Sequence, residues 1–560
     1  MTEAFSNSLA RMFIAGLGAG AALVTAGGCV VGGDDATDRA GASSRSIAGG
    51  FPQGDGDHVA PQTPATQTFT AMTSPPLSAG LAQVLSDGRV IAQDADTNEW
   101  WTLTPDNTGS YLTGTWAQIA SGPSGYSPLY YASAVLPDGR FFTAGGEYIA
   151  GAEAFSSAGA IYDPTQNKWT SITKPSTFTQ IGDAQSIVLA DGRFMMADCC
   201  TTQEAVLNPT NLTWTSIGTG KEDINDEEGW TLLPDGRVLT VDANNTAKPM
   251  ESEIFSPTTG AWTSAGSVGV QLADINTTED SHELGPAVLR PDGTVIAFGA
   301  IGHNAVFTAA TSAWSAAPDF PTVTGGQLDC ADAPAALLPN GNVLVATSPG
   351  VYQAGAVFFE WDGTHLNTVG SPAGAAGESS YEYNMLVLPT GEILLTSQST
   401  DIEIYEPVAA TNTSAIEPAI TTVPVLESTS GFEGSVLAEV RALEALSATS
   451  HISPDLLPLM DIYTGRTYTF TGERFNGISQ GGAYGDDAQA STAFPLVRFT
   501  NQATGHVQYA RTHDGTNFSI AATTTGSTEV DIPATIEGGL SQMQVVANGI
   551  ASPALLVNVK

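Results

Sequence analysis

The sequence has few basic residues and few cysteines for its length. Lys and Arg number 18 against 58 Asp and Glu, so the 560-residue chain carries a formal net charge of −40. This excess of negative charge excludes a nucleic acid or an anionic lipid surface as a favourable partner, because like charges repel. Four cysteines exclude a disulfide-dense scaffold. A hydrophobic content of 42% excludes wholesale disorder, so we expect a folded, acidic protein.

Long apolar runs are also scarce, and the one that matters lies at the N-terminus. Residues 12–26 have the length of a signal-peptide core and are too short to span a bilayer comfortably. Ala26-Gly27-Gly28-Cys29 is similar to a bacterial lipobox, so 1–29 is interpreted as a leader with Cys29 as the lipidated residue. An ordinary cleaved signal with an incidental cysteine is the alternative. We expect an extracytoplasmic protein, secreted or on the bacterial cell surface, that touches the membrane only through this anchor.

Glycine and proline, at 60 and 32 residues, are abundant and favour a turn-rich β architecture. After a flexible tether at 30–65, one unit recurs seven times between residues 66 and 407: an apolar strand, a tight turn ending in glycine, and a second apolar strand. Asp-Gly between apolar strands is a strong hairpin signal, because glycine accepts a positive φ. The turn glycines lie roughly 50 residues apart and are Gly88, Gly139, Gly192, Gly236, Gly293, Gly341 and Gly391.

A second pattern follows four of these hairpins. In each, an apolar residue precedes a tryptophan by seven positions; the tryptophans are Trp169, Trp214, Trp262 and Trp314. This spacing fits two strands joined by a β-turn, which brings each unit to four strands. Four strands repeating at this period predict an all-β, seven-bladed kelch-type propeller. The strand-like segment 66–72 is expected to pair in the last blade and close the ring.

The rest of the chain predicts a second β domain. About seven short alternating segments between 467 and 560 suggest an immunoglobulin-like β-sandwich. Residues 408–466 are interpreted as a linker, and leucines and a valine about one turn apart indicate a short helix at 434–446. Nothing in the sequence points to an oligomer.

Kelch-type blades followed by such a sandwich resemble the galactose oxidase/glyoxal oxidase family over roughly residues 66–560. That resemblance implies a copper ion on the channel axis, held by two tyrosines and two histidines, with one tyrosine cross-linked to a cysteine. Tyr130 matches a ligand tyrosine, and His506 in LVRFTNQATGHVQYAR matches the last histidine. Tyr381-Glu382 stands where the family has Tyr-His, and the first blade offers no cysteine. We therefore predict no Tyr–Cys radical cofactor.

One column of residues carries the strongest hint of chemistry. The position that opens the innermost strand of each blade is acidic in five of seven blades, although only about one residue in ten of the chain is acidic. The seven residues are Ala79, Tyr130, Asp183, Glu227, Glu283, Asp332 and Glu382. Because propeller blades stack around one axis, we expect these side chains to converge on one mouth of the channel, with His506 approaching from the sandwich.

Three readings of this acidic mouth stay open. A divalent cation could bind, with Glu227, Glu283, Asp332 and His506 as candidate ligands and calcium favoured over copper. Two carboxylates could serve general acid/base chemistry, as in glycoside hydrolysis. Each carboxylate could instead brace its own loop through backbone N–H groups. The adjacent Cys199 and Cys200 could form a vicinal disulfide, or be two small buried side chains.

The sequence favours a surface-anchored binding module that holds a glycan, peptide or cation at the channel mouth. The alternatives are an extracellular hydrolase that uses the carboxylates and a divergent copper oxidase. Fold alone does not choose among these, because propellers host many activities, and whether the protein is an enzyme stays open.

Overall fold

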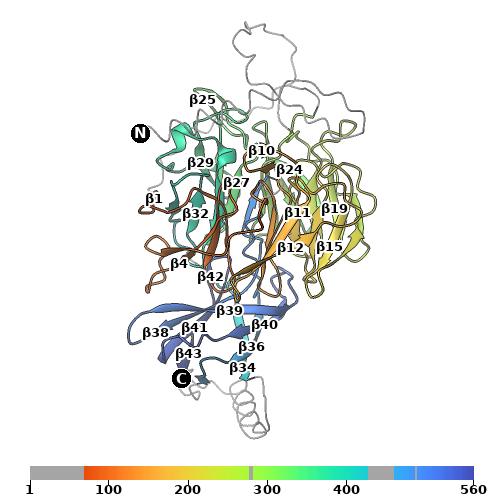
Figure 1. Cartoon of the computed structure of the whole chain (residues 1–560). Helices are drawn as coiled ribbons and strands as arrows, with labels where there is room; N and C mark the ends of the chain where they lie inside the picture. Colours follow the sequence, from red (N-terminus) through yellow and green to blue (C-terminus); the bar gives the residue numbers. More distant parts are fainter. Residues whose placement is uncertain (1–67, 276–281, 411, 427–459, 486–488) are drawn as a thin grey trace.

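The computed structural model describes residues 68–275, 282–410, 412–426, 460–485 and 489–560. The leader, Cys29, the tether and the helix expected at 434–446 lie outside these residues. Among the described residues there is no helix long and apolar enough to cross a membrane. The regular secondary structure of these residues is almost entirely strand, arranged as a ring of sheets with a second β unit beneath it (Figure 1).

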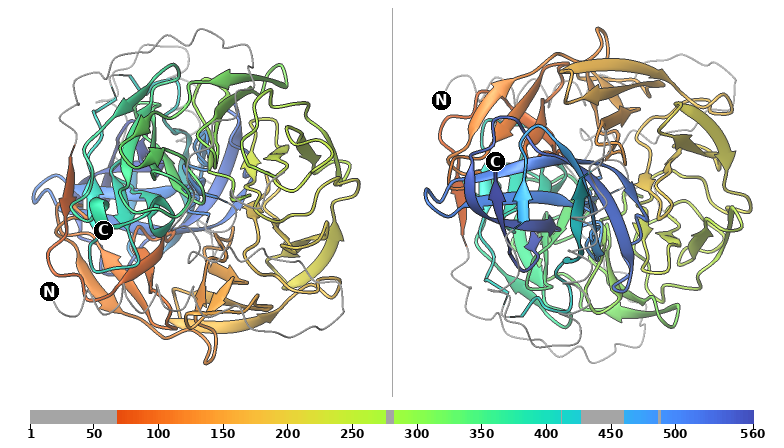
Figure 2. Two further views of the ribbon diagram at one scale, coloured as in Figure 1. Left: turned by 90° about the horizontal axis from the view of Figure 1, so that it is seen from above. Right: turned by 90° about the horizontal axis from the view of Figure 1, so that it is seen from below.

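Seven antiparallel sheets surround one central axis, as Figure 2 shows from both ends. The first three blades contain β2 (Ala79–Val84), β3 (Val90–Asp94), β4 (Trp100–Thr104) and β5 (Thr115–Gln118); β7 (Ala132–Val135), β8 (Phe141–Ala144), β11 (Ala158–Asp163) and β12 (Lys168–Thr173); β13 (Ser186–Val188), β14 (Phe194–Ala197), β15 (Glu204–Asn208) and β16 (Thr213–Ile217). The next two contain β17 (Thr231–Leu232), β18 (Val238–Val241), β19 (Ser252–Ser256) and β20 (Ala261–Ser264); β21 (Ala287–Leu289), β22 (Thr294–Phe298), β23 (Asn304–Thr308) and β24 (Ala313–Ala317).

The last two blades each recruit a strand from elsewhere in the chain. Blade six contains β27 (Pro334–Leu337), β28 (Val343–Thr347), β29 (Val357–Trp361) and β30 (Leu366–Thr368), and blade seven contains β31 (Asn384–Val387), β32 (Ile393–Thr396) and β33 (Glu403–Tyr405). The N-terminal strand β1 (Phe69–Ala71) pairs with β33 and supplies the fourth strand of blade seven. Phe69 packs against Phe358 and Tyr405, with ring centroids 5.0 and 4.9 Å apart. This is the predicted ring closure.

The tryptophan pattern has a direct structural meaning. The apolar residue and the tryptophan seven positions later face each other across the third and fourth strands, as in Phe255↔Trp262 and Phe307↔Trp314. Their rings lie 5.3 and 5.1 Å apart. Aromatic pairs at such distances add stabilisation beyond their buried area. The repeated spacing therefore fixes both the hairpin and the aromatic packing on the four blades that carry it.

Short elements decorate the end of the ring farthest from the C-terminal unit. β6 (Pro128–Leu129), β9 (Tyr148–Ile149) and β10 (Ala152–Glu153) form one small sheet, and β25 (Thr322–Val323) and β26 (Gly326–Gln327) form a hairpin. Two 3-10 turns, η1 (Ala375–Gly377) and η2 (Ser380–Glu382), precede β31. β10 and β25 mark this end in Figure 1.

The C-terminal unit is a β structure with its own core. Its strands are β34 (Ala419–Leu426), β35 (Met460–Ile462), β36 (Thr467–Glu473), β38 (Leu496–Asn501), β39 (Val507–Thr516), β40 (Thr525–Asp531), β41 (Gly539–Ala547), β42 (Ile550–Ala551) and β43 (Leu555–Val559). The long strand β39 pairs with β38 through its first half and with β40 through its second half. Buried residues such as Phe470, Phe499 and Val545 pack between these strands. The immunoglobulin-like character of this unit stays a prediction.

One strand of the C-terminal half leaves that unit and joins the propeller. β37 (Gly482–Tyr484) pairs antiparallel with β27, the innermost strand of blade six, with Pro334 opposite Tyr484. It lies on the channel side of β27, which makes this blade five-stranded. A segment nearly 150 positions later in the chain thus runs along the inside of the ring.

Candidate functional site

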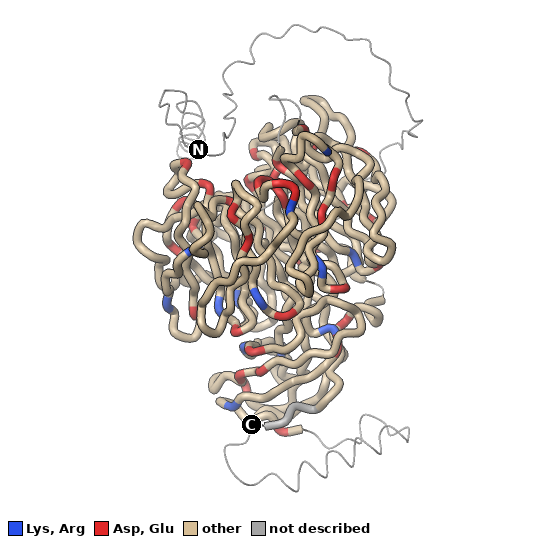
Figure 3. Tube along the Cα trace, turned by 90° about the vertical axis from the view of Figure 1, so that its right-hand side faces the viewer, with Lys and Arg blue, Asp and Glu red and all other residues tan. Residues whose placement is uncertain are grey.

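The two faces of the propeller are distinguished by what contacts the hairpin turns. Gly88 packs against Tyr509, Gly139 against Thr512 and Gly192 against Phe518, so the turns meet the C-terminal unit. Because each innermost strand runs from the acidic column to its turn, the column lies at the opposite face. In Figure 3 the Asp and Glu residues gather mainly at that far end of the propeller, and most Lys and Arg residues lie nearer the C-terminal unit.

Three carboxylates from three successive blades meet at this mouth. Glu227 precedes β17, Glu283 precedes β21 and Asp332 precedes β27, and one carboxylate oxygen from each lies within 4.8 Å of the others. All three side chains are partly buried. We call these residues the carboxylate triad. Like charges this close repel, so the arrangement favours a bound cation or donors that offset the charge.

Tyr352 is one such donor, and no sequence motif predicts it. Its hydroxyl donates a hydrogen bond of 2.6 Å to Oε1 of Glu283, while 46% of the residue is exposed. Desolvation of the hydroxyl, together with the charges of Glu283 and Asp332, raises the pKa of Tyr352 well above its usual value. The hydroxyl therefore stays protonated and donates to the triad. Its ring stands edge-on to Tyr381 at 5.2 Å.

The strand β37 supports the mouth from inside the channel. The hydroxyl of Tyr484 donates to the backbone carbonyl of Tyr381 at 2.8 Å, and its ring stacks on Tyr130 at 6.2 Å. The next residue, Gly485, packs directly against Asp332: a Cβ at this position would lie 2.5 Å from Asp332 Oδ1. The C-terminal half of the chain therefore reaches the triad through β37.

His506 was expected to approach the mouth from the C-terminal unit, but it is β37 that does so. His506 sits in the β38–β39 hairpin, where its Nδ1 contacts Oε2 of Glu537 at 2.9 Å. The neighbouring Val507 N–H bonds to the carbonyl of Asn107, in the loop after β4 on the face that meets the C-terminal unit. His506 thus lies on the opposite face from the triad, because the hairpin that carries it packs under blade one.

The other column residues have contacts of their own. Gln398 donates to the Tyr130 hydroxyl at 3.0 Å, and burial raises the pKa of Tyr130 well above its usual value. Asp183 is buried beside Cys199. Glu382 accepts the backbone N–H of Ser379 at 2.8 Å and so braces its own turn. The bracing interpretation therefore holds for Glu382.

Several of these positions share an uncommon backbone conformation. Tyr130, Glu227 and Asp332 have φ of 53°, 61° and 47°, in the left-handed region that non-glycine residues seldom adopt. Such residues cost about 1–3 kcal/mol each and persist where the surrounding structure holds them in place. Two of the three triad residues, Glu227 and Asp332, are therefore held in a backbone conformation that the surrounding structure must stabilise.

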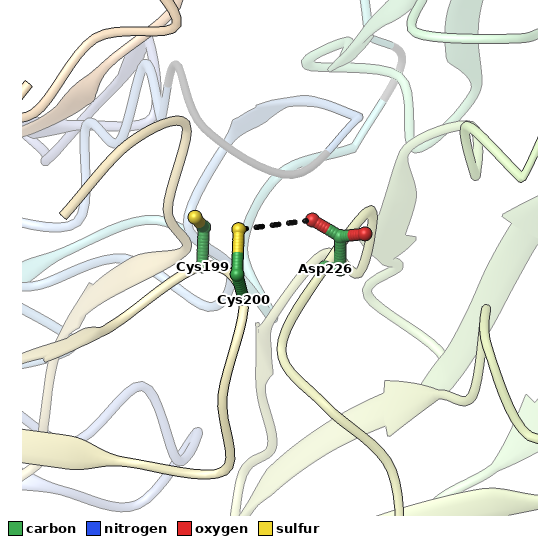
Figure 4. A group of neighbouring side chains, drawn as sticks. All are labelled: Cys199, Cys200 and Asp226. Atoms are coloured by element: carbon green, nitrogen blue, oxygen red, sulfur yellow. Dashed lines mark hydrogen bonds between the residues drawn. The ribbon is translucent and has the colours of Figure 1, made fainter. Parts of the chain in front are cut away.

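A thiol pair lies next to the triad. Cys199 and Cys200 follow β14, and Cys200 Sγ donates to Asp226 Oδ1 at 3.7 Å (Figure 4). Cys199, Cys200 and Cys330 are free thiols, so the vicinal disulfide expected as one alternative is wrong for this structure. Desolvation, followed by the charges of Cys200 and Glu283, raises the pKa of Asp226 to about 8. The hydrogen bond with Cys200, together with burial, raises the pKa of the Cys199 thiol.

Beneath the mouth lies a buried charge cluster built around Lys221. Its ammonium contacts Glu228 at 3.0 Å and Glu253 at 2.7 Å, and none of the three side chains is more than 1% exposed. Desolvation raises the pKa of Asp242 to about 7 and that of Glu228 well above its usual value. The run Lys221–Glu228 has the composition of a solvated loop, so sequence reasoning missed the cluster.

The residues at the mouth do not fit the copper centre of the oxidases. Glu382, in place of the histidine beside Tyr381, is engaged by its own turn. His506 lies on the other face, and His282 Nδ1 contacts Oδ1 of Asn244 at 2.9 Å. Carboxylate oxygens are ligands that suit hard cations such as Ca²⁺. The triad therefore offers donor atoms of the kind that a hard cation prefers.

The close contact of Gly485 gives a direct test of this geometry. Gly485→Ala should push the Asp332 carboxylate out of the triad, because a Cβ within 2.5 Å of its oxygen cannot be accommodated in place. We expect a loss of stability of about 1–3 kcal/mol, typical of overpacking, measured by urea unfolding. Gly377→Ala, where nothing lies within 4 Å of the added Cβ, is the matched control. Equal effects of the two changes would contradict the contact.

Comparison with known proteins gives a local similarity in sequence and a likeness in fold. No family model matches the chain. The kelch-like protein terF of Aspergillus terreus is 28% identical over 130 residues, which are 22% of this chain and 26% of that protein. The chain thus spans about a quarter of the length of the curated relative it matches.

The solved structures that resemble the chain share little sequence with it. A fungal alcohol oxidase of the AA5 family, in complex with copper, aligns over 89% of this chain and 100% of its own, with a TM-score of 0.45 and 12% identity. Virginiamycin B lyase from Staphylococcus aureus, with quinupristin, aligns over 61% of this chain and 100% of its own, with a TM-score of 0.43 and 9% identity. The seven sheets around one axis make the chain a seven-bladed β-propeller, and part of its sequence is similar to a kelch-like protein.

Proposed function

We propose that the protein binds a hard divalent cation such as Ca²⁺ at the carboxylate triad. The bound cation would in turn coordinate a ligand at the channel mouth. The observation that carries the proposal is the meeting of Glu227, Glu283 and Asp332 from three blades within 4.8 Å. Calcium binds oxygen at about 2.3–2.6 Å, so two ligands of one ion stand at most about 5 Å apart. The triad meets this limit without rearrangement.

The surroundings of the triad support a binding role. Ca²⁺ takes six to eight oxygen ligands, so three carboxylates leave positions for water or for the hydroxyls and carbonyls of a ligand. Tyr352 and Tyr381 flank the triad, and Tyr352 is 46% exposed. Aromatic faces beside a cation with open positions suit a glycan or a peptide. Export and a lipid anchor on Cys29 remain part of this proposal.

Calcium titration of the full chain tests the proposal. Wild-type protein should bind one Ca²⁺ by calorimetry and gain thermal stability with it, because an ion that binds only the folded state stabilises it. Glu227→Gln and Asp332→Asn should each weaken binding roughly tenfold or more, since ligand charge count sets calcium affinity. Binding should also weaken as pH falls, because protons compete for the carboxylates.

Glu382→Gln is the matched control, because it removes a column carboxylate that serves its own turn. It should leave calcium affinity unchanged. Calcium binding that survives Glu227→Gln and Asp332→Asn together, or that is absent from the wild type, would refute the triad as a cation site.

A glycan hydrolase is the second candidate, and Asp226 is the observation that favours it. Burial, followed by the charges of Cys200 and Glu283, raises the pKa of Asp226 to about 8. A neutral acid beside a carboxylate is the pair that glycoside hydrolysis uses. If the wild type releases the aryl group from chromogenic glycosides and Asp226→Asn does not, the hydrolase is supported.

A further inference from the structure

We propose that Cys199, Cys200 and Asp226 form a second metal site, for a borderline-soft divalent cation of the Zn²⁺ type. One ligand atom from each of these residues lies within 4.8 Å of the others. The site is distinct in chemistry from the carboxylate triad, because thiolate sulfur selects Zn²⁺ over Ca²⁺. It goes beyond the proposed calcium function and does not depend on it.

The two sulfur atoms lie within 4.8 Å of each other. Two sulfurs bonded to one zinc at about 2.3 Å stand about 3.8 Å apart in a tetrahedron. The side-chain amide of Gln180 approaches Cys199 Sγ at 3.5 Å and Cys200 Sγ at 3.2 Å, so both sulfurs are reached from one side. Figure 4 shows Cys200 facing the Asp226 carboxylate. Small side-chain adjustments would bring two sulfurs and one oxygen onto a common ion.

Three segments hold these residues in place. Cys199 N–H bonds to the carbonyl of Ile181, and Asn225 N–H bonds to the carbonyl of Thr201. The side-chain amide of Asn225 also donates to the Thr201 carbonyl at 2.8 Å. These bonds tie the loop before β13, the turn after β14 and the loop before β17 to one another. The ligand groups are therefore positioned before any metal binds, which reduces the entropy lost on binding.

The site is closed on one side and reachable on the other. Cys199 is fully buried, whereas Cys200 and Asp226 are partly exposed. Three protein ligands leave a fourth tetrahedral position for water, the arrangement of zinc sites that keep an open position. A metal ion can therefore enter from the mouth and still present one exchangeable ligand there.

Cobalt substitution tests the site, because Co²⁺ bound by thiolates absorbs visible and near-ultraviolet light. Reduced full-length protein should show a thiolate-to-cobalt band that saturates at one equivalent and disappears when Zn²⁺ is added. Cys200→Ser should weaken binding by at least about 100-fold, beyond the 10–100-fold typical of residues that only support a ligand. Asp226→Asn should weaken it by about tenfold or more while keeping a sulfur band.

Two controls separate this site from the rest of the molecule. Cys330→Ser removes a buried thiol outside the cluster and should leave the cobalt band intact. Glu227→Gln should weaken calcium binding and keep the cobalt band, whereas Cys200→Ser should keep calcium binding and weaken cobalt binding, so each site can fail alone. Absence of a thiolate band in the wild type, or equal loss in Cys330→Ser and Cys200→Ser, would overturn the proposal.

Discussion

Replacing Lys221 by methionine is expected to lower the free energy of unfolding by about 3–5 kcal/mol, the cost of breaking a buried ion pair by removing one partner. Methionine keeps most of the length of the side chain and removes its charge. The carboxylates of Glu228 and Glu253, which are 0% and 1% exposed, would then face each other without a cation. Urea unfolding followed by tryptophan fluorescence measures the change.

Lys248→Met is the matched control for this prediction. Lys248 pairs with Glu222 in the same region, but both side chains are close to half exposed. Exposed pairs contribute little, so this variant should unfold as the wild type does. Adding Glu228→Gln and Glu253→Gln to Lys221→Met should restore part of the stability, because the buried charges are then gone. Equal midpoints for Lys221→Met and Lys248→Met would show that the cluster is not desolvated.

The blades could be predicted from sequence because their signals are local. Asp-Gly turns need only a few residues to specify a hairpin, and the seven-residue spacing to Trp262 and Trp314 specifies the next one. The ring closure could be deduced because the seventh unit lacks one strand and residues 66–72 can supply it. The column of acidic residues could be predicted from the same repeat, because equivalent positions of the blades surround one axis. The structure brings three of its acidic residues together at one mouth.

The parts that could not be predicted depend on contacts between distant segments. β37 pairs with β27 across nearly 150 residues, and its only local signal is the cluster of Gly481, Gly482 and Gly485, which marks close approach of backbones. His506 was placed at the mouth by local similarity to a hairpin, although the segment that enters the channel precedes that hairpin. Lys221 is one lysine in an acidic run, and only tertiary packing decides that it is buried.

Stability is expected to fall as pH rises through the range from about 4.5 to 8, in part because of Glu204. Its side chain is 1% exposed, and Trp262 Nε1 donates to its Oε2 at 2.9 Å. Burial raises the pKa of Glu204 to about 8 in the folded protein, from an ordinary value of 4.5. Between these values the folded state keeps a proton that the unfolded chain has lost. Folding is therefore linked to proton binding, and raising the pH favours unfolding.

Glu204→Gln isolates this contribution, because glutamine still accepts the Trp262 N–H and does not titrate. Relative to wild type, the variant should gain stability between pH 5 and pH 8, by on the order of 4 kcal/mol for a shift of this size. Below pH 4.5 the two proteins should differ by a constant amount, since Glu204 is then protonated in both states. A pH-independent effect of Glu204→Gln would mean that the carboxylate is ionised in the folded protein and that Lys221, which approaches it from the buried cluster, balances its charge.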